Sequence, residues 1–182
     1  MIVLSKLFFI IYRLHNKIAN VIRRNYVTNR MRGFYPPHII GKVYVQTKTL
    51  KIGKNVTLYP GVYLWGNDIE IGDNVDIGIG TIIYSSKKIK IGSNTSIAGQ
   101  CYIIDSNHST KDGILIRNQQ DEVAENGIEI GSDVWIAAQC SVLKGARIGD
   151  GAVIGAQSLV NSEIPPNGIA VGTPAKLIKY RS

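Results

Sequence analysis

The part of the sequence that decides the fold reads IGSDVWIAAQCSVLKGARIGDGAVIGAQSLVNSEI over residues 130–164. Aliphatic residues recur there at every sixth position, at Ile130, Ile136, Val142, Ile148, Ile154 and Val160. Four positions after each lies a residue that is mostly small, such as Cys140 or Ala146. No helix has a period of six, so the chain must turn at every repeat and stack its aliphatic side chains inward. The spacing predicts a parallel β-helix.

The same period occurs earlier in the chain, with two lapses. The step from Leu64 to Ile71 is one residue too long, and the step from Ile83 to Ile91 is two residues too long. Extra residues are tolerated at a surface corner, where they disturb no core position. We therefore expect corner insertions, the longer one at the SSKK segment, 85–88.

The longest interruption is polar and lacks the period altogether. It runs over residues 105–127 and predicts a loop that leaves the coil, of a length that is usually functional. The β-helix is expected to occupy 36–182. Residues 1–35 are expected to form a separate amphipathic helical segment, with apolar residues at helical spacing and basic residues mostly off that stripe. This segment either packs on the protein or binds an anionic membrane surface.

The composition argues against several classes of protein. The chain has 182 residues, a net charge of +8 and only two cysteines. Two cysteines without a CxxC pair argue against a disulfide framework or a zinc ribbon and favour a reducing cytoplasm, with membrane association as the alternative. Cys101 and Cys140 fall on the small repeat position, so we interpret both as core residues. Positive charge suits phosphorylated cofactors and membranes, and no motif supports nucleic-acid binding.

Residues 131–179 carry a family resemblance. They contain the segment DVWI, a run of coils, the turn IPPN and the tail VGTPAK in this order. In this they resemble the closing coils of the hexapeptide-repeat acetyltransferases, specifically the galactoside, maltose and xenobiotic branch, and are similar to polysaccharide O-acetyltransferases. The resemblance spans about residues 70–180 and does not include the N-terminal segment. It implies an all-β fold, a left-handed parallel β-helix with an extruded loop and a C-terminal tail.

The resemblance also implies an activity. Family members are homotrimers with acetyl-CoA in the groove between two subunits, and they need no metal. The implied base is His108, in the sequence DSNHST at the start of the loop, which would take the proton of a hydroxyl as it attacks the thioester. A solvated loop histidine is the alternative. Asp105 or a loop carbonyl is expected to orient the ring, and Asn107 the ring or the acceptor.

Acetyl-CoA is expected to contact residues that match the family's motifs. Small residues at Ala138 and Ala156 would let the pantetheine arm lie against the coil, although corner geometry alone also explains them. The remaining positions match family residues near the active site, the nucleotide or the phosphates, where a tail cation suits an anion. These positions are Trp135, Asn161, Ser162, Lys176 and Lys179.

The sequence thus predicts O-acetylation of a saccharide, either a cell-surface polysaccharide precursor or a nucleotide-linked sugar. The alternatives are N-acetylation of an amino sugar and a non-catalytic β-solenoid that binds partners. A zinc-dependent carbonic anhydrase on the same coil would need three histidines, and the coil region contains only His108. The family's acceptor contacts are replaced here by Gly78 and Ser86, so the acceptor stays open.

Overall fold

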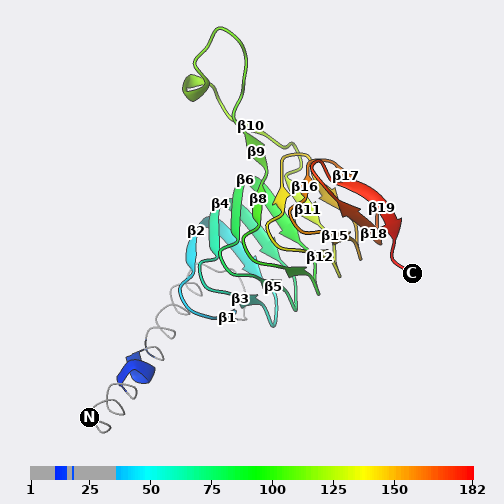
Figure 1. Cartoon of the computed structure of the whole chain (residues 1–182). Helices are drawn as coiled ribbons and strands as arrows, with labels where there is room; N and C mark the ends of the chain where they lie inside the picture. Colours follow the sequence, from blue (N-terminus) through cyan, green and yellow to red (C-terminus); the bar gives the residue numbers. More distant parts are fainter. Residues whose placement is uncertain (1–10, 16–17, 19–35) are drawn as a thin grey trace, which may run out of the picture.

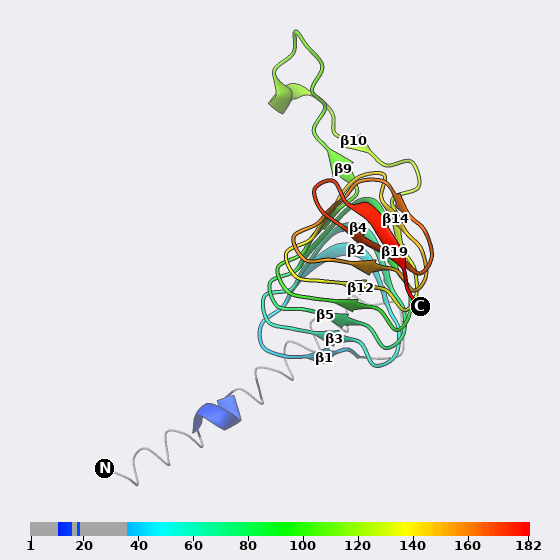
Figure 2. The same ribbon diagram turned by 45° about the vertical axis from the view of Figure 1, so that its right-hand side comes forward.

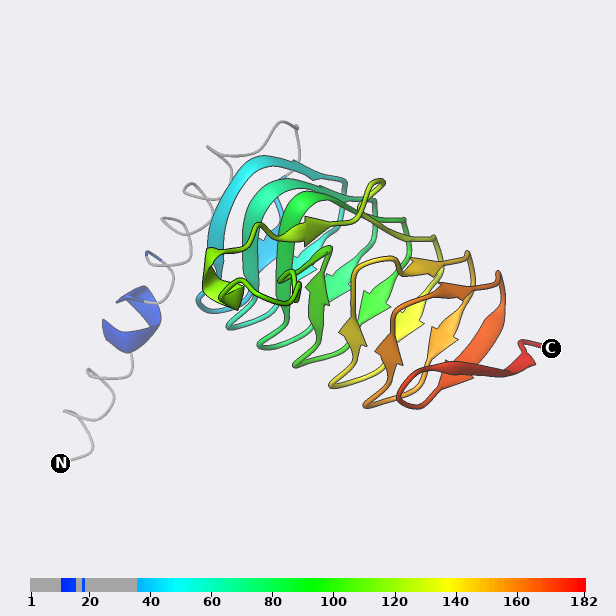
Figure 3. The ribbon, with the colours of Figure 1, turned by 90° about the horizontal axis from the view of Figure 1, so that it is seen from above.

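Short strands and tight corners wind the chain into a left-handed parallel β-helix with three faces, as predicted (Figures 1 and 2). The computed structural model describes residues 11–15, 18 and 36–182. Stacked coils pair in parallel, with most partners 16 to 20 residues apart along the chain. One pair of neighbouring coils has partners 39 residues apart, because the loop leaves the coil between them. Figure 3 shows the coils in order along the axis.

Face I consists of one short strand from each coil. Its strands are β1 (His38–Ile39), β3 (Thr57–Leu58), β5 (Asp76–Ile77), β7 (Ser96–Ile97), β12 (Trp135–Ile136), β15 (Val153–Ile154) and β18 (Gly168–Val171). The antiparallel strand β19 (Lys176–Tyr180) closes this sheet at the C-terminal end.

Faces II and III share three long strands that bend over a corner. These are β2 (Tyr44–Ile52), β4 (Tyr63–Ile71) and β6 (Ile82–Ile91). Face II continues with β8 (Tyr102–Ile104), β13 (Ser141–Val142) and β16 (Leu159–Val160). Face III continues with β11 (Ile128–Ile130), β14 (Arg147–Ile148) and β17 (Glu163–Ile164). The loop holds β9 (Ser106–Asn107), the short 3₁₀ helix η1 (Ile116–Asn118) and β10 (Glu122–Val123).

The core is the stack of aliphatic residues that the six-residue period predicts. Ile136, Val142, Ile154 and Val160 are fully buried, and Ile97, Ile136 and Ile154 are register partners on successive coils. Each fully buried side chain of this kind stabilises the fold by about 1.5–3 kcal/mol. Because every coil contributes one aliphatic residue to each face, the period alone fixes which side of each strand faces inward.

Corners stack as well, through polar side chains on residues with positive φ. Gln100, Gln139 and Gln157 have φ near +60°, and their amides form a ladder in which each next coil donates to the previous one at 3.0 and 3.1 Å. Inside the corners, Cys101 and Cys140 are buried, and their thiols donate to carbonyls of the following coil. The hydrogen bond with the Cys140 thiol and then burial raise the pKa of Cys101, which fits a core residue.

Face III is charged, and its signs alternate along the axis. The register partners in order are Lys51, Glu70, Lys90, Glu129, Arg147 and Glu163. Lys90 Nζ lies 2.9 Å from Glu129 Oε1. The hydrogen bond with Lys90 lowers the pKa of Glu129, and the same bond raises that of Lys90. Face III is therefore a solvated surface.

Most of the N-terminal amphipathic segment lies outside the described residues. Residues 11–15 and 18 are helical, and the side chains of Ile11, Leu14 and Ile18 are exposed. No helix among the described residues is long and apolar enough to cross a membrane.

Candidate active site

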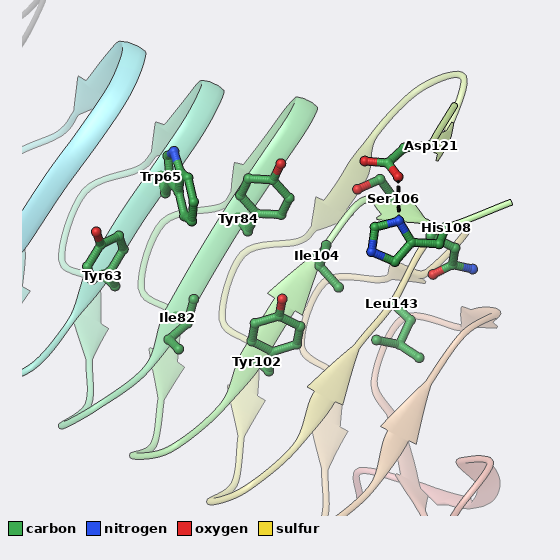
Figure 4. Close-up of a pocket in the computed structure, with 11 residues that line it drawn as sticks. Tyr63, Trp65, Ile82, Tyr84, Tyr102, Ile104, Ser106, His108, Asp121 and Leu143 are labelled. Carbon is green, nitrogen blue, oxygen red and sulfur yellow. Dashed lines mark ion pairs between the residues drawn. The ribbon is translucent and has the colours of Figure 1, made fainter. Parts of the chain in front are cut away.

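A hollow of about 690 Å³ lies on face II at the base of the extruded loop (Figure 4). Its walls are outward-facing side chains of successive coils, among them Trp65, Tyr84 and Tyr102. His108 and Asp121, both from the loop, stand at one end. Sequence reasoning missed the aromatic wall. Its signal was available, because aromatic residues replace the usual polar ones at outward strand positions.

The imidazole of His108 is held by a carboxylate. Its Nδ1 lies 2.7 Å from Asp121 Oδ1, within ion-pair distance. With Nδ1 engaged, Nε2 is the ring nitrogen that can accept a proton. Figure 4 shows Asp121 above the ring and Tyr84, Ile104 and Leu143 on the side of the hollow. The arrangement is that of a general base with an orienting carboxylate.

Pairing within the loop brings this carboxylate to the histidine. β9 precedes His108 and pairs antiparallel with β10, which follows Asp121. The return strand is tied to the coil by an ion pair of 2.8 Å between Glu122 and Lys144. The hydrogen bond with Lys144 lowers the pKa of Glu122. The two ends of the loop therefore meet beside the hollow, whereas its tip projects away from the coils (Figures 1 and 2).

Asp105 does not contact the ring, contrary to the expectation that it would orient His108. The side chain is fully buried, and its oxygens accept backbone N–H groups of Ser86, Lys87 and Lys88 at 2.6, 2.9 and 2.9 Å. Those donors belong to the corner insertion of the preceding coil. Asp105 therefore anchors the start of the loop to the coil, because a carboxylate can accept several N–H groups that an insertion leaves unpaired.

We expect Asp121 to position the ring of His108, and its replacement tests this expectation. We expect Asp121→Ala to lower kcat about tenfold with little change in KM for acetyl-CoA, because the ring loses its fixed orientation. The effect is modest because the two side chains are 41% and 75% exposed, so water screens the contact. Steady-state kinetics measure it, and Asp121→Glu should recover part of kcat. An unchanged kcat in Asp121→Ala would exclude the role.

The residues predicted to bind acetyl-CoA lie on other parts of the coil surface. Trp135 is 55% exposed on face I. Ala138 and Ala156 occupy the same corner of neighbouring coils, where Gln157 N–H donates to the Ala138 carbonyl at 2.9 Å. Lys176 and Lys179 lie on β19, which extends face I. One chain therefore places Trp135, Lys176 and Lys179 on face I, and Ala138 and Ala156 at the corner between faces I and II, whereas His108 lies in the loop.

The other predicted residues lie on the side of the loop. Asn107 lines the hollow directly. Asn161 and Ser162 are exposed at the corner between faces II and III, just after β16. Within residues 11–15, 18 and 36–182, no cluster of three His, Cys, Asp or Glu side chains could hold a metal ion.

Comparison with known proteins identifies the six-residue repeats. Residues 127–162 match the family described as bacterial transferase hexapeptide (six repeats). Residues 127–162 of the chain therefore carry hexapeptide repeats of the bacterial transferase type. A stretch of 40 residues is 52% identical to a chloramphenicol acetyltransferase of Morganella morganii, and one of 38 residues is 58% identical to a protein of Schizosaccharomyces pombe. The matched stretches span only about a fifth of the curated relatives' length.

Solved structures resemble this hexapeptide-repeat protein over most of its length. A variant of AntD, an N-acyltransferase from Bacillus cereus in complex with dTDP-4-amino-4,6-dideoxyglucose and coenzyme A, has a TM-score of 0.75 at 21% identity and covers 87% of this chain and 88% of its own. A maltose O-acetyltransferase from Clostridium difficile 630 has a TM-score of 0.61 at 24% identity, with coverages of 88% and 75%. A galactoside acetyltransferase in complex with coenzyme A has a TM-score of 0.55 at 26% identity, and the match covers 79% of this chain and 64% of its own.

Proposed function

We propose that the protein transfers an acetyl group from acetyl-CoA to a hydroxyl of a saccharide, with His108 as the general base. The observation that carries this proposal is the His108–Asp121 pair at the end of an open hollow, with Nε2 available to the acceptor. Support also comes from the printed functions of the similar proteins, an O-acetyltransferase for maltose and a galactoside acetyltransferase that binds coenzyme A.

The reaction needs one proton acceptor and one leaving group. His108 Nε2 takes the proton of the acceptor hydroxyl as its oxygen attacks the thioester carbonyl, and Asp121 stabilises the imidazolium that forms. The C–S bond then breaks, the proton passes to the thiolate, and the products are an acetyl ester and coenzyme A. No covalent intermediate on the protein is required, because both substrates are bound together.

The positions of the residues predicted to bind acetyl-CoA suggest that several copies of the chain assemble. Trp135, Lys176 and Lys179 lie on face I, away from the loop that carries His108. We include in the proposal a homotrimer in which the C-terminal coils of face I, around Trp135, meet the His108 hollow of the neighbouring subunit, so that donor and acceptor share one crevice. Light scattering of the full chain would report its mass.

The deciding experiment measures acetyl-CoA turnover with a panel of sugars and amino sugars. The rate is monitored through the release of the coenzyme A thiol. Mass spectrometry of the product, before and after mild alkali, separates esters from amides because only esters are cleaved. N-acetylation is the second candidate, since AntD is named an N-acyltransferase and its complex holds an amino sugar. Turnover of amino sugars alone would favour this candidate, and no turnover with any acceptor would overturn both.

A further inference from the structure

Face II differs from the charged face III in carrying a row of aromatic rings. We define the aromatic ladder as Tyr44, Tyr63, Trp65, Tyr84 and Tyr102, all at outward positions of face II. Ring centroids of successive members are 5.1 Å apart for Tyr44 and Tyr63, 6.0 Å for Tyr63 and Trp65, and 5.2 Å for Trp65 and Tyr84. The first four members therefore form a continuous aromatic surface across three coils, and Tyr102 lies on the next coil, beyond Ile82.

The ladder leads into the hollow and extends beyond it. Tyr63, Trp65, Tyr84 and Tyr102 line the hollow together with His108. Tyr44 continues the row one coil further from the loop. The four coils that carry the ladder span three steps of about 4.8 Å each, about 14 Å in all. This length exceeds what one sugar ring needs beside the base.

Among the described residues, the face II segments of the strands carry no cation of their own. The face II segments contain neither Lys, Arg, Asp nor Glu, over residues 44–47, 63–66, 82–85, 102–104, 141–142 and 159–160. Among the described residues that line the hollow there is likewise no Lys or Arg, and Asp121 adds a carboxylate. Lys42 Nζ lies 4.7 Å from the Tyr44 ring centroid, at the end of the ladder away from the loop. A diphosphate is held best by Lys or Arg side chains, so the hollow suits an uncharged ligand better.

The ladder does carry hydrogen-bonding groups. Tyr63 donates its hydroxyl to Gln46 Oε1 at 3.2 Å. The hydroxyls of Tyr84 and Tyr102 and the indole N–H of Trp65 make no hydrogen bond within the described part of the chain. Trp65 is 49% exposed and Tyr102 39%. Aromatic faces with free polar groups at their edges match a chain of sugar rings, which presents C–H faces and hydroxyls in alternation.

We propose that the acceptor is an uncharged glycan of several rings, which lies along the aromatic ladder with the acetylated hydroxyl at His108. This inference rests on the proposed transfer reaction and narrows its acceptor. A nucleotide-linked sugar is the competing acceptor, and it would bring two phosphates into a hollow whose described lining residues include no Lys or Arg. A single sugar would leave Tyr63 and Tyr44 without a ligand.

The test compares acceptors of increasing length with the full chain and acetyl-CoA. The panel contains neutral oligomers of glucose, galactose, mannose and N-acetylglucosamine, each as one ring and as progressively longer chains, together with UDP-glucose. For the preferred glycan, kcat/KM is expected to rise at least about tenfold from one ring to several, since stacking on an aromatic ring contributes at this level. UDP-glucose is expected to be no better than glucose.

Trp65→Ala supplies the decisive variant, and Tyr59→Ala its matched control. Trp65→Ala is expected to remove the gain with length. Tyr59 is also an exposed aromatic residue, but it follows β3 on face I, so its variant should retain the gain. A flat dependence on length, or a preference for UDP-glucose, would overturn the inference while the transfer reaction stands. A lower mass of Trp65→Ala in light scattering would also overturn it, because the ladder would then be a contact between copies.

Binding measurements separate the two proposals. If wild type turns over no acceptor, the proposed transfer fails. In that case the ladder can still be tested by isothermal titration calorimetry, in which the longest oligomers are titrated into the protein. Binding by wild type and Tyr59→Ala but not by Trp65→Ala would support the ladder alone. Equal binding by all three proteins, or by none, would overturn it.

Discussion

Replacement of His108 by alanine is expected to lower kcat by about 10²- to 10⁴-fold, the usual contribution of a general base. The physical reason is that a sugar hydroxyl is a poor nucleophile until its proton has somewhere to go. No other imidazole lies beside the hollow within the described residues. KM for acetyl-CoA should change little, because the predicted donor contacts lie elsewhere on the coil. Initial rates of thiol release with a saturating acceptor measure the effect.

The matched control is His38→Ala. His38 is an exposed histidine on β1 of face I, far along the coil from the loop, so its variant should keep the wild-type rate. Added imidazole should restore part of the activity of His108→Ala by replacing the missing group. Turnover by His108→Ala at the wild-type rate would remove the base from the proposed mechanism, and the transfer would then need another proton acceptor.

The fold could be predicted because its sequence signal is local and repeated. Each aliphatic position from Ile130 to Val160 is buried, since a fixed period leaves only one side of every strand free to face the core. The insertion at SSKK was also predictable. In the structure the register between β4 and β6 shifts at this place, where Ser85 pairs with Gly66 and Lys88 with Asp68. A lapse in a strict period reveals an insertion directly.

The site was less predictable because its contacts join parts of the chain that no period relates. His108 could be named from a motif, but its partner Asp121 reaches it only when β9 and β10 pair. The loop carries several acidic residues, and their spacing favours none of them. Asp105 was nearer in sequence and was therefore the natural choice, yet its carboxylate turns inward to donors of the preceding coil. A residue close to His108 in sequence can therefore point its side chain away from the ring, because the chain turns at a corner.

Where the loop rejoins the coil, the backbone conformation requires a glycine at one position. Gly127 has φ +71°, and a Cβ added there would lie 1.9 Å from the carbonyl oxygen of Lys88. Only glycine allows the chain to rejoin the stack this closely. Both ends of the loop therefore meet the same corner insertion, Asp105 through its carboxylate and Gly127 through close backbone approach. The insertion and the loop form one structural unit that fixes the place of His108.

Asp105→Asn should therefore impair both stability and catalysis. Asparagine keeps the shape but replaces one acceptor oxygen with an N–H donor, which would face the backbone N–H groups of Ser86, Lys87 or Lys88. We expect the free energy of unfolding to fall by about 2–4 kcal/mol, since buried donors lose charged acceptors. We also expect kcat to fall about tenfold or more, because His108 follows the anchor by three positions. Urea unfolding and steady-state kinetics measure the two effects.

Asp73→Asn provides the control, because it changes the same kind of contact away from the loop. Asp73 Oδ1 accepts the backbone N–H of Lys54 at 2.7 Å on an exposed corner. Its replacement should cost less than about 1 kcal/mol and leave kcat unchanged, since water can satisfy an exposed donor. If Asp105→Asn loses stability but keeps the wild-type kcat, the anchor supports the fold without positioning His108. If both quantities stay at the wild-type level, the insertion holds its shape without the carboxylate.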